Sequence, residues 1–325
     1  LNRNRRIWIY LPPDYESSDK RYPVIYMQDG QNLFDQATSF AGEWEVDESL
    51  NELFEQGDHG CIVVGIENGG NLRADEYAPW LNTNYNLGGE GGAYLDFIAQ
   101  TLKPHVDANY RTLAGREYTC LFGSSLGALI SHYGLVEHQD VFGKAGSFSP
   151  AYWFNPQVYD HSASTPKSGP VKLYFLAGIP EDNGSVVSAV NQMHGLMANN
   201  GYGELEMQRL FHADGQHSEW YWAREFPAAY LWLFAGMDFT AAAEESPSQQ
   251  LFLFPNPADS TVQLKGAASL RRPQYQVMSL DGRLMKKGRL HDGGISISDL
   301  PAGMYVMRII SRKAEVYTQQ LLIQR

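Results

Sequence analysis

The chain has 325 residues, of which 43% are hydrophobic and 19% charged, and its formal net charge is −12. This length suits two domains, and the composition is that of a globular protein, which excludes a disordered or fibrous chain. No apolar run reaches the roughly 18–20 residues that a membrane-spanning helix needs. The acidic charge argues against nucleic acid or anionic membrane as a partner, because binding phosphates takes clustered Lys and Arg.

The charge is unevenly distributed along the chain. Residues 251–325 carry eleven Lys and Arg against five Asp and Glu, a net +6, which leaves −18 on residues 1–250. Such a split indicates two units with different surfaces. The sequence starts without a charged-then-apolar stretch, so we expect any signal peptide to have been removed or to lie outside it.

The first 237 residues alternate strand-like and helix-like segments. Near-continuous apolar runs ending in Gly or a polar residue are typical of parallel strands buried on both faces. Strands are predicted at 5–13, 22–30, 61–69, 118–124, 172–178 and 206–214, and helices at 42–56, 93–110, 125–138, 185–200 and 218–236. This alternation predicts βαβ units and hence a mostly parallel sheet with helices on both faces. Cys61 and Cys120 lie in two of the strands, and we expect free, buried thiols rather than a disulfide.

A second unit follows a change in composition. Residues 238–250, DFTAAAEESPSQQ, are small and polar without periodicity and are interpreted as a linker. From Leu251 onward, seven short strand-like pieces alternate with turn signals such as NPADS, DGR and PAG. We therefore predict an all-β sandwich at 251–325, separate from a domain at 1–237.

The strongest chemical signal is the pentapeptide Gly123-Ser124-Ser125-Leu126-Gly127. It fits G-x-S-x-G, with Ser125 placed after an apolar strand and before an amphipathic helix, as in the nucleophile elbow of an α/β-hydrolase. The tight turn lifts the serine hydroxyl clear of the sheet, and side chains at the two glycine positions would collide with neighbouring backbone. We expect Ser125 to be the nucleophile and Ser124 to pack or to form a hydrogen bond.

A serine nucleophile needs a base, and in this fold the acid and the histidine follow the serine in chain order. His217, in DGQHSEW, falls after the last predicted strand, and we choose it as the base over His212 at the end of that strand. The other seven histidines lie in helical stretches, polar connections or the second unit. The acid should follow strand 172–178, where Glu181 is our choice and Asp182 the alternative, and the one not used should cap the next helix.

An oxyanion hole requires two backbone N–H groups that point at the developing negative charge. One should come from Leu126, the residue after the nucleophile. The second should come from the loop after strand 22–30, where Gly30 and Gln31 occupy the expected place, and we choose Gln31.

With these residues in place, the chain resembles the esterase D, or feruloyl-type, branch of the α/β-hydrolases. The resemblance covers about residues 3–237 and rests on IYLPPDY, RYPVIYMQDGQNLFD, LKPHVDANYRT, FGSSLG, SFSPAYW, AGIPEDN and DGQHSEWYWAREF in family order. It implies a triad of Ser125, Glu181 and His217 and adds no cofactor. The family includes feruloyl, acetylxylan and enterochelin esterases and the mycolyltransferases, so the motifs do not select one activity.

The second unit resembles the C-terminal sorting domain of type IX secretion. FPNPADSTVQL, SLDGRLM, ISDLPAGMYVMRI and QQLLIQR carry the likeness. It implies handling by the type IX machinery through residues 251–325, export across the outer membrane, and release or attachment at the cell surface. The alternative is a spacer or carbohydrate-binding sandwich, which the placing of Tyr275, Tyr305 and Tyr317 inside strands argues against.

Aromatic residues near predicted loops and strand ends bear on the substrate. Trp153 and Trp220, and after them Trp80, are predicted to line the substrate site, where aromatic faces stack on a sugar ring or an aryl group. We expect an acetyl or hydroxycinnamoyl ester of a polysaccharide or a related small ester. An acyltransferase with the same triad, a peptidase, and a catalytically silent surface binding protein remain alternatives. No His-rich or carboxylate-rich cluster has ligand spacing, so neither a metal nor a cofactor is expected.

Overall fold

The computed structural model describes residues 1, 3–237, 239, 252–254, 258–265, 274–279, 283–289, 294–310 and 316–324. The chain forms two compact units, Leu1–Ala243 and Glu244–Arg325, and each is described by itself. The linker predicted at 238–250 lies outside the described residues, apart from Phe239.

The first unit is built on a seven-stranded sheet with the order β1-β3-β2-β6-β7-β8-β9. β1 pairs antiparallel with β3, and every other neighbouring pair is parallel. The carboxyl ends of six strands therefore meet at one edge of the sheet, where α/β folds carry their sites. The strands are β1 (Ile7–Tyr10), β2 (Val24–Gln28), β3 (Ile62–Ile66), β6 (Thr119–Ser124), β7 (Lys144–Phe148), β8 (Lys172–Gly178) and β9 (Met207–His212).

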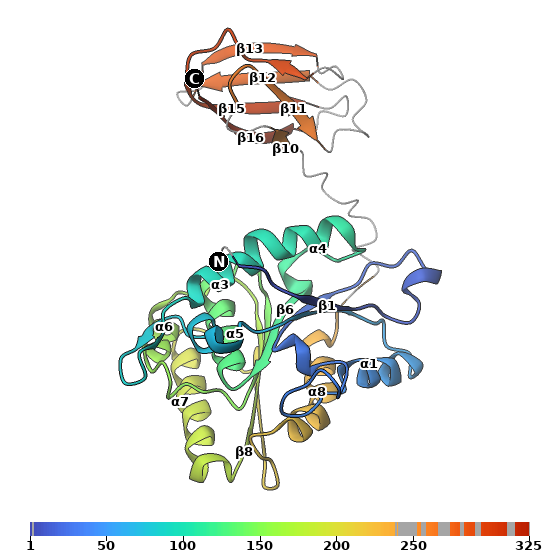
Figure 1. Cartoon of the computed structure of the whole chain (residues 1–325), viewed down its shortest axis with the longest axis vertical. Coiled ribbons are helices and arrows are strands. Elements are labelled where there is room, and N and C mark those ends of the chain that lie inside the picture. The colour runs from blue at the N-terminus through green and yellow to red at the C-terminus, as the bar shows by residue number, and fades with distance from the viewer. Residues whose placement is uncertain are drawn as a thin grey trace. The chain divides into compact units, whose positions relative to one another are not determined.

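Helices cover both faces of this sheet (Figure 1). One face packs against α1 and α8, and the other against α3 to α7, each through its own apolar core. The helices are α1 (Val46–Glu55), α2 (Arg73–Glu76), α3 (Gly91–Phe97), α4 (Lys103–Asn109), α5 (Leu126–Glu137), α6 (Gln157–Ser164), α7 (Ser185–Asn199) and α8 (Glu219–Phe234). The α/β-hydrolase fold class predicted from the alternating pattern is confirmed. None of the helices in the described part of the chain is both long and apolar enough to cross a bilayer.

The strand β7 was not predicted, and its composition explains why. In KAGSF only Phe148 is a large apolar residue, although every position is buried. A Cβ at Gly146 would lie 2.1 Å from the ring of Phe122 on the neighbouring strand β6, so the space that a larger residue would fill is already occupied. Because a side chain of the neighbouring strand fills the space beside Gly146, β7 is buried without the run of large apolar residues that predicts a strand.

Two further differences concern loops and helices. The helix α6, which carries His161, was not predicted. The segment predicted as one helix at 93–110 is continuous but widens into a π turn at Ile98–Leu102, just before Pro104. Proline lacks an N–H and its ring collides with the carbonyl four residues earlier, so a local change in winding relieves the contact.

Both cysteines are free and buried, as expected. Cys120 lies in β6 and Cys61 immediately before β3, and β2 lies between these strands in the sheet.

A buried histidine on α5 makes a testable contribution to stability. His132 is fully buried, its Nε2 lies 2.9 Å from Ser162 Oγ and its Nδ1 2.8 Å from Tyr152 Oη, and burial lowers its pKa to about 3. Below about pH 6.5, His132 is protonated in the unfolded chain but not in the folded chain. Its contribution to the free energy of unfolding is therefore fully present above that pH and decreases as the pH falls toward 3. The expected loss is about 1.4 kcal/mol per pH unit.

Urea unfolding of the wild type and of His132→Asn between pH 7.5 and 5 measures this loss. All seven Trp residues precede residue 233, so Trp fluorescence follows the first unit alone. We expect the pH dependence of the unfolding free energy to weaken in His132→Asn by about one proton. The matched variant His105→Asn, on the exposed surface of α4, should retain it. Equal slopes in all three proteins would contradict the assignment to His132.

The second unit is a β-sandwich of a three-stranded sheet, β10-β11-β14, and a four-stranded sheet, β13-β12-β15-β16. All seven predicted strands are present in the described residues. Val262 and Ile295 from the first sheet share one core with Val277, Met307 and Ile309 from the second. The strands are β10 (Phe252–Phe254), β11 (Thr261–Lys265), β12 (Gln274–Ser279), β13 (Leu284–Arg289), β14 (Ile295–Ser296), β15 (Gly303–Ile310) and β16 (Val316–Ile323).

Candidate active site

The predicted nucleophile occupies a strained turn between β6 and α5. Ser125 has φ 57° and ψ −120°, a conformation that non-glycine residues rarely adopt. Its N–H donates to Phe148 O at 2.9 Å, and its carbonyl accepts from Ala151 N–H at 3.1 Å. These two bonds to the end of β7 and the loop after it hold the turn in place.

The two glycines of the pentapeptide are required by packing. A Cβ at Gly123 would lie 2.8 Å from the carbonyl of Gly127, which is the collision with backbone expected from the sequence. A Cβ at Gly127 would lie 3.0 Å from Cβ of Gln28, so the second glycine makes room for a side chain of β2 instead. Ser124 is 6% exposed at the end of β6 and faces the interior.

The predicted base and acid are in contact. His217 Nδ1 lies 2.9 Å from Glu181 Oε2, and the Glu181 side chain is 1% exposed. Because a carboxylate only accepts hydrogen bonds, this contact selects the tautomer of the neutral imidazole with the proton on Nδ1, which is the tautomer that a general base requires. The two loops meet through a close backbone approach, since a Cβ at Gly178 would lie 2.1 Å from Gly215 O.

Two side chains that the sequence did not single out support the carboxylate. Glu181 Oε1 accepts from Gly178 N–H at 2.6 Å and from Ser149 Oγ at 2.8 Å. The indole N–H of Trp222 donates to Ser149 Oγ at 2.9 Å, and its ring stands edge-on to the His217 ring at 5.1 Å. Glu181 is thus fixed by three hydrogen bonds, one of them to the base. SFSPAYW and DGQHSEWYWAREF contain these residues, but only the fold shows that they meet.

The competing candidates make other contacts. Asp182 is exposed, adopts a left-handed conformation and accepts a hydrogen bond from Ser185 Oγ at 2.5 Å, at the first turn of α7. His212 Nδ1 lies 3.2 Å from Tyr221 Oη and 3.4 Å from Glu225 Oε1, both on α8. In the described residues, no hydrogen bond or ion pair joins Asp182 to His212, and neither takes part in the Glu181–His217 contact.

A cavity of about 380 Å³ opens beside His217 and Glu181. Its wall also includes the segment after β7, to which the Ser125 backbone is bonded. In the described part of the chain, Ser125 Oγ makes no hydrogen bond to His217, a contact that in many hydrolases tightens only in the substrate complex. The lining residues are Ser149, Pro150, Ala151, Trp153, Glu181, Asp182, Val186 and His217.

The predicted oxyanion donors lie at suitable places in the fold. Leu126 is the first residue of α5, where a helix leaves N–H groups without an intrahelical acceptor. Gln31 lies in the 3₁₀ turn Gly30–Asn32 that follows β2. A Cβ at Gly30 would lie 2.5 Å from the carbonyl carbon of Gly65, so this turn packs directly on β3 and only glycine fits.

The structure separates the three tryptophans that were predicted to line the substrate site. Trp153 is 61% exposed and lines the cavity. Trp220 is 46% exposed, is not a cavity residue, and carries the Arg224 guanidinium 5.3 Å from its ring centroid. Trp80 is partly buried and packs edge-on against Tyr133 and His161 at the margin of the core. Tyr85, which was not predicted, is 57% exposed and lies edge-on to Trp153 at 6.1 Å.

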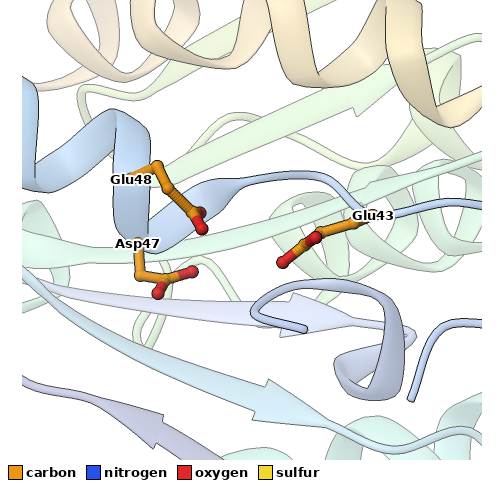
Figure 2. Close-up of side chains that lie close together, drawn as sticks. All are labelled: Glu43, Asp47 and Glu48. Carbon is orange, nitrogen blue, oxygen red and sulfur yellow. The ribbon is translucent and has the colours of Figure 1, made fainter. Parts of the chain in front are cut away.

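Three carboxylates gather at the start of α1, a grouping that the sequence analysis did not expect (Figure 2). Oxygens of Glu43, Asp47 and Glu48 lie within 4.8 Å of one another. Partial burial, a hydrogen bond to Glu48 and the charges of Glu48 and Glu43 raise the pKa of Asp47 to about 6. The sequence did not reveal the cluster because Glu43 precedes the helix and reaches it only through the bend of the loop.

Comparison with known proteins identifies the first unit. Residues 1–233 match the model of the Esterase family, whose description is "Putative esterase". The chain belongs to the Esterase family. It is accordingly an esterase, and the α/β-hydrolase resemblance seen in its motifs is confirmed at the level of the family.

Relatives and solved structures cover the same part of the chain. "Uncharacterized protein YbbA" of Bacillus subtilis is 27% identical over 242 residues, which span 71% of this chain and 93% of YbbA. The structure is similar to a ferulic acid esterase, at a TM-score of 0.55 and 16% identity over 71% of this chain and 93% of that one. It is also similar to the enterobactin esterase FES of Shigella flexneri, at 0.57 and 19% over 71% and 55%. At these identities the structural likeness shows the fold alone.

The second unit matches a different family. Residues 252–324 match the secretion system C-terminal sorting domain, which belongs to type IX secretion. The esterase is therefore exported to the cell surface or secreted, as the sequence analysis predicted.

Proposed function

We propose that this esterase cleaves carboxylic esters through an acyl-enzyme on Ser125, with His217 as general base and Glu181 as the acid that orients it. The observation that carries the proposal is the Glu181–His217 hydrogen bond at the edge of the sheet where the strained Ser125 turn lies. The family membership supports ester hydrolysis independently of these residues.

The geometry supports the following steps. His217 Nε2 takes the proton of Ser125 Oγ as that oxygen attacks the ester carbonyl, and Glu181 stabilises the imidazolium that forms. The N–H groups of Leu126 and Gln31 stabilise the oxyanion. The imidazolium then gives its proton to the departing alcohol. A water deprotonated by His217 attacks the acyl-enzyme, which releases the acid and restores the serine.

For the substrate we propose an acetyl or hydroxycinnamoyl ester of a polysaccharide or a related small ester. An exposed Trp153 on the cavity wall, with Tyr85 beside it, offers flat aromatic faces to a sugar ring or an aryl group. The similarity to a ferulic acid esterase supports an aryl acyl group, and export places the enzyme where polysaccharide esters occur. Residues 251–325 would deliver the chain to the type IX machinery.

Trapping of the acyl-enzyme tests the proposal. Wild-type protein is mixed with p-nitrophenyl acetate or methyl ferulate, quenched with acid within the first turnover and digested for mass spectrometry. We expect an acetyl or feruloyl group on the peptide that contains Ser125, and the same peptide should react with a fluorophosphonate probe. Ester hydrolysis without any label on this peptide would contradict the proposed mechanism. Transfer of the acyl group to an added sugar in preference to water would identify an acyltransferase.

The exposed Trp153 allows a prediction about specificity. Trp153→Ala should lower kcat/KM for methyl ferulate about tenfold, because stacking with an aromatic ring contributes about 0.5–1.5 kcal/mol beyond the buried area. Hydrolysis of ethyl acetate, which has no ring, should change much less. Trp220→Ala is the matched control, since this side chain is exposed but is not a cavity residue. Equal losses on both esters, or a larger loss in Trp220→Ala, would count against stacking on Trp153.

A further inference from the structure

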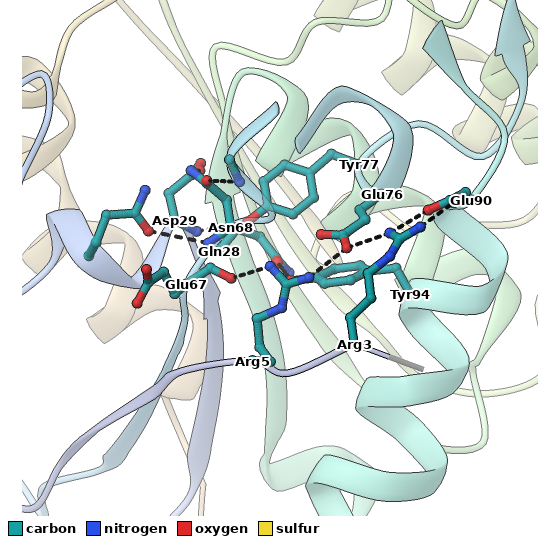
Figure 3. Close-up of polar contacts among 12 residues, drawn as sticks. Arg3, Arg5, Gln28, Asp29, Glu67, Asn68, Glu76, Tyr77, Glu90 and Tyr94 are labelled. Atoms are coloured by element: carbon teal, nitrogen blue, oxygen red, sulfur yellow. Dashed lines mark hydrogen bonds and ion pairs between the residues drawn. The ribbon is translucent and has the colours of Figure 1, made fainter. Parts of the chain in front are cut away.

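The residue before the predicted oxyanion turn is a buried aspartate. Asp29 has a left-handed backbone, φ 54°, and its side chain is 9% exposed. Its N–H donates to Tyr77 Oη at 3.0 Å, and its Oδ1 accepts from Asn68 Nδ2 at 2.6 Å. Asn68 also donates its own N–H to Gln31 Oε1 at 3.3 Å. Tyr77 and Asn68, which lie beside Asp29 in Figure 3, thus bond to the residue that precedes the turn, and Asn68 also bonds to the Gln31 side chain within it.

The charge of this aspartate is matched by one arginine. Arg73 donates from Nε to Asp29 Oδ1 at 2.7 Å and from Nη2 to Oδ2 at 2.8 Å, a two-pronged ion pair. Burial alone would lower the pKa of Arg73, but the charge of Asp29 and its hydrogen bonds outweigh this and raise it. Arg73 therefore keeps its charge beside the Asp29 side chain at the edge of the candidate site.

The short helix that carries Arg73 is anchored at its other end. Glu76, the last residue of α2, is completely buried and accepts from Arg3 at 2.9 Å and from Arg5 at 2.5 Å. Arg5 donates in addition to Glu67 O at 2.8 Å, and Arg3 to Glu90 at 2.6 Å (Figure 3). A helix of four residues has little stability of its own. The N-terminal segment therefore fixes the direction from which Arg73 reaches Asp29.

We propose that Arg73 and Asp29 are positioning residues for catalysis, which hold the Gly30–Gln31 turn so that the Gln31 N–H points at the oxyanion. This inference rests on the proposed function, in which that N–H is one of the two donors. The two residues touch no reacting atom and act through the turn.

The ion pair has a second consequence for the reaction. Asp29 lies two residues from Gln31, so an unneutralised carboxylate there would oppose the negative charge that develops on the substrate oxygen. Arg73 cancels this field as well as fixing the side chain. Removal of Arg73 alone should consequently be worse than removal of both charges.

The test measures hydrolysis of p-nitrophenyl acetate and inhibition by phenylboronic acid, which forms a tetrahedral adduct with an activated serine. Arg73→Met should lower kcat about 10- to 100-fold, below the loss of a complete oxyanion donor, with KM nearly unchanged. Its affinity for the boronate should fall in parallel with kcat. Asp29→Asn keeps a residue type that tolerates the left-handed backbone, and the double variant Asp29→Asn/Arg73→Met should recover about tenfold in kcat over Arg73→Met.

Arg116→Met provides the control. Arg116 precedes β6 at the opposite edge of the sheet and donates to the carbonyls of Gln139 and Pro170. Arg116→Met should at most change the melting temperature of the protein, and it should leave kcat and the affinity for the boronate unaltered. Arg73→Met with a lower melting temperature but wild-type kcat and boronate affinity would overturn the positioning role and leave the proposed function intact. Absence of esterase activity and boronate binding in the wild type would overturn both.

Discussion

Ser125→Ala should abolish ester hydrolysis, with kcat/KM for p-nitrophenyl acetate falling by at least about 10⁴-fold. Ser149 also lines the cavity, but its Oγ is bonded to Glu181 and to Trp222, whereas Ser125 stands at the strained turn between β6 and α5. The backbone of Ser125 is bonded to Phe148 at the end of β7 and to Ala151 on the cavity wall. Steady-state assays of both proteins, with circular dichroism to confirm folding, measure the effect.

The adjacent serine is the natural control for this experiment. Ser124 has the same side chain one residue earlier, but it is buried at the end of β6. Ser124→Ala should therefore keep kcat/KM within about threefold of the wild type, with any loss appearing in stability. A reversed result, in which Ser124→Ala is inactive and Ser125→Ala is active, would exchange the two assignments.

Local signals explain why so much of the fold could be predicted from sequence. The nucleophile elbow can be recognised from one stretch of the sequence, because its glycines, the strand before it and the helix after it are adjacent in the chain. The strand β7 was missed because the volume beside Gly146 is supplied by Phe122 from another strand. The helix α6 was missed because it has only 8 residues and its buried residues are Val158 and Ser162.

The candidate site was predictable in its chain order but not in its contacts. Ser149, Trp222 and the Asp29–Arg73 pair reach the site across long sequence separations, and no spacing in the sequence indicates such encounters. The same limit applies to the tryptophans. Proximity to a strand end suggested three of them, whereas the direction of each side chain decides that Trp153 alone lines the cavity.

The choice between the two acidic residues shows what the structure adds to the sequence. Glu181 and Asp182 are neighbours, and the sequence does not indicate which of them faces the base. In the fold the chain turns through left-handed conformations at Asp182 and Asn183, which are residue types that tolerate them. The turn directs Glu181 into the interior toward His217 and leaves Asp182 exposed.

Glu181→Gln should lower kcat by about 10³- to 10⁴-fold while the protein stays folded. The amide has the size of the carboxylate, so the loss comes from chemistry rather than from a cavity. An amide can turn its NH₂ toward Nδ1 and select the wrong tautomer, and it does not stabilise the imidazolium. Because Gly178 N–H and Ser149 Oγ both donate to Oε1, the amide oxygen is drawn to that side, which leaves the NH₂ facing His217.

Asp182→Asn is the matched variant, since it removes a charge one residue away. Its contact is with Ser185 at the start of α7, so kcat should stay within about twofold of the wild type. Labelling by a fluorophosphonate separates activation of the serine from later steps. We expect slow labelling in Glu181→Gln and normal labelling in Asp182→Asn. The opposite pattern would make Asp182 the acid, which would require the 181–184 turn to reverse in solution and His217 to exchange a buried partner for an exposed one.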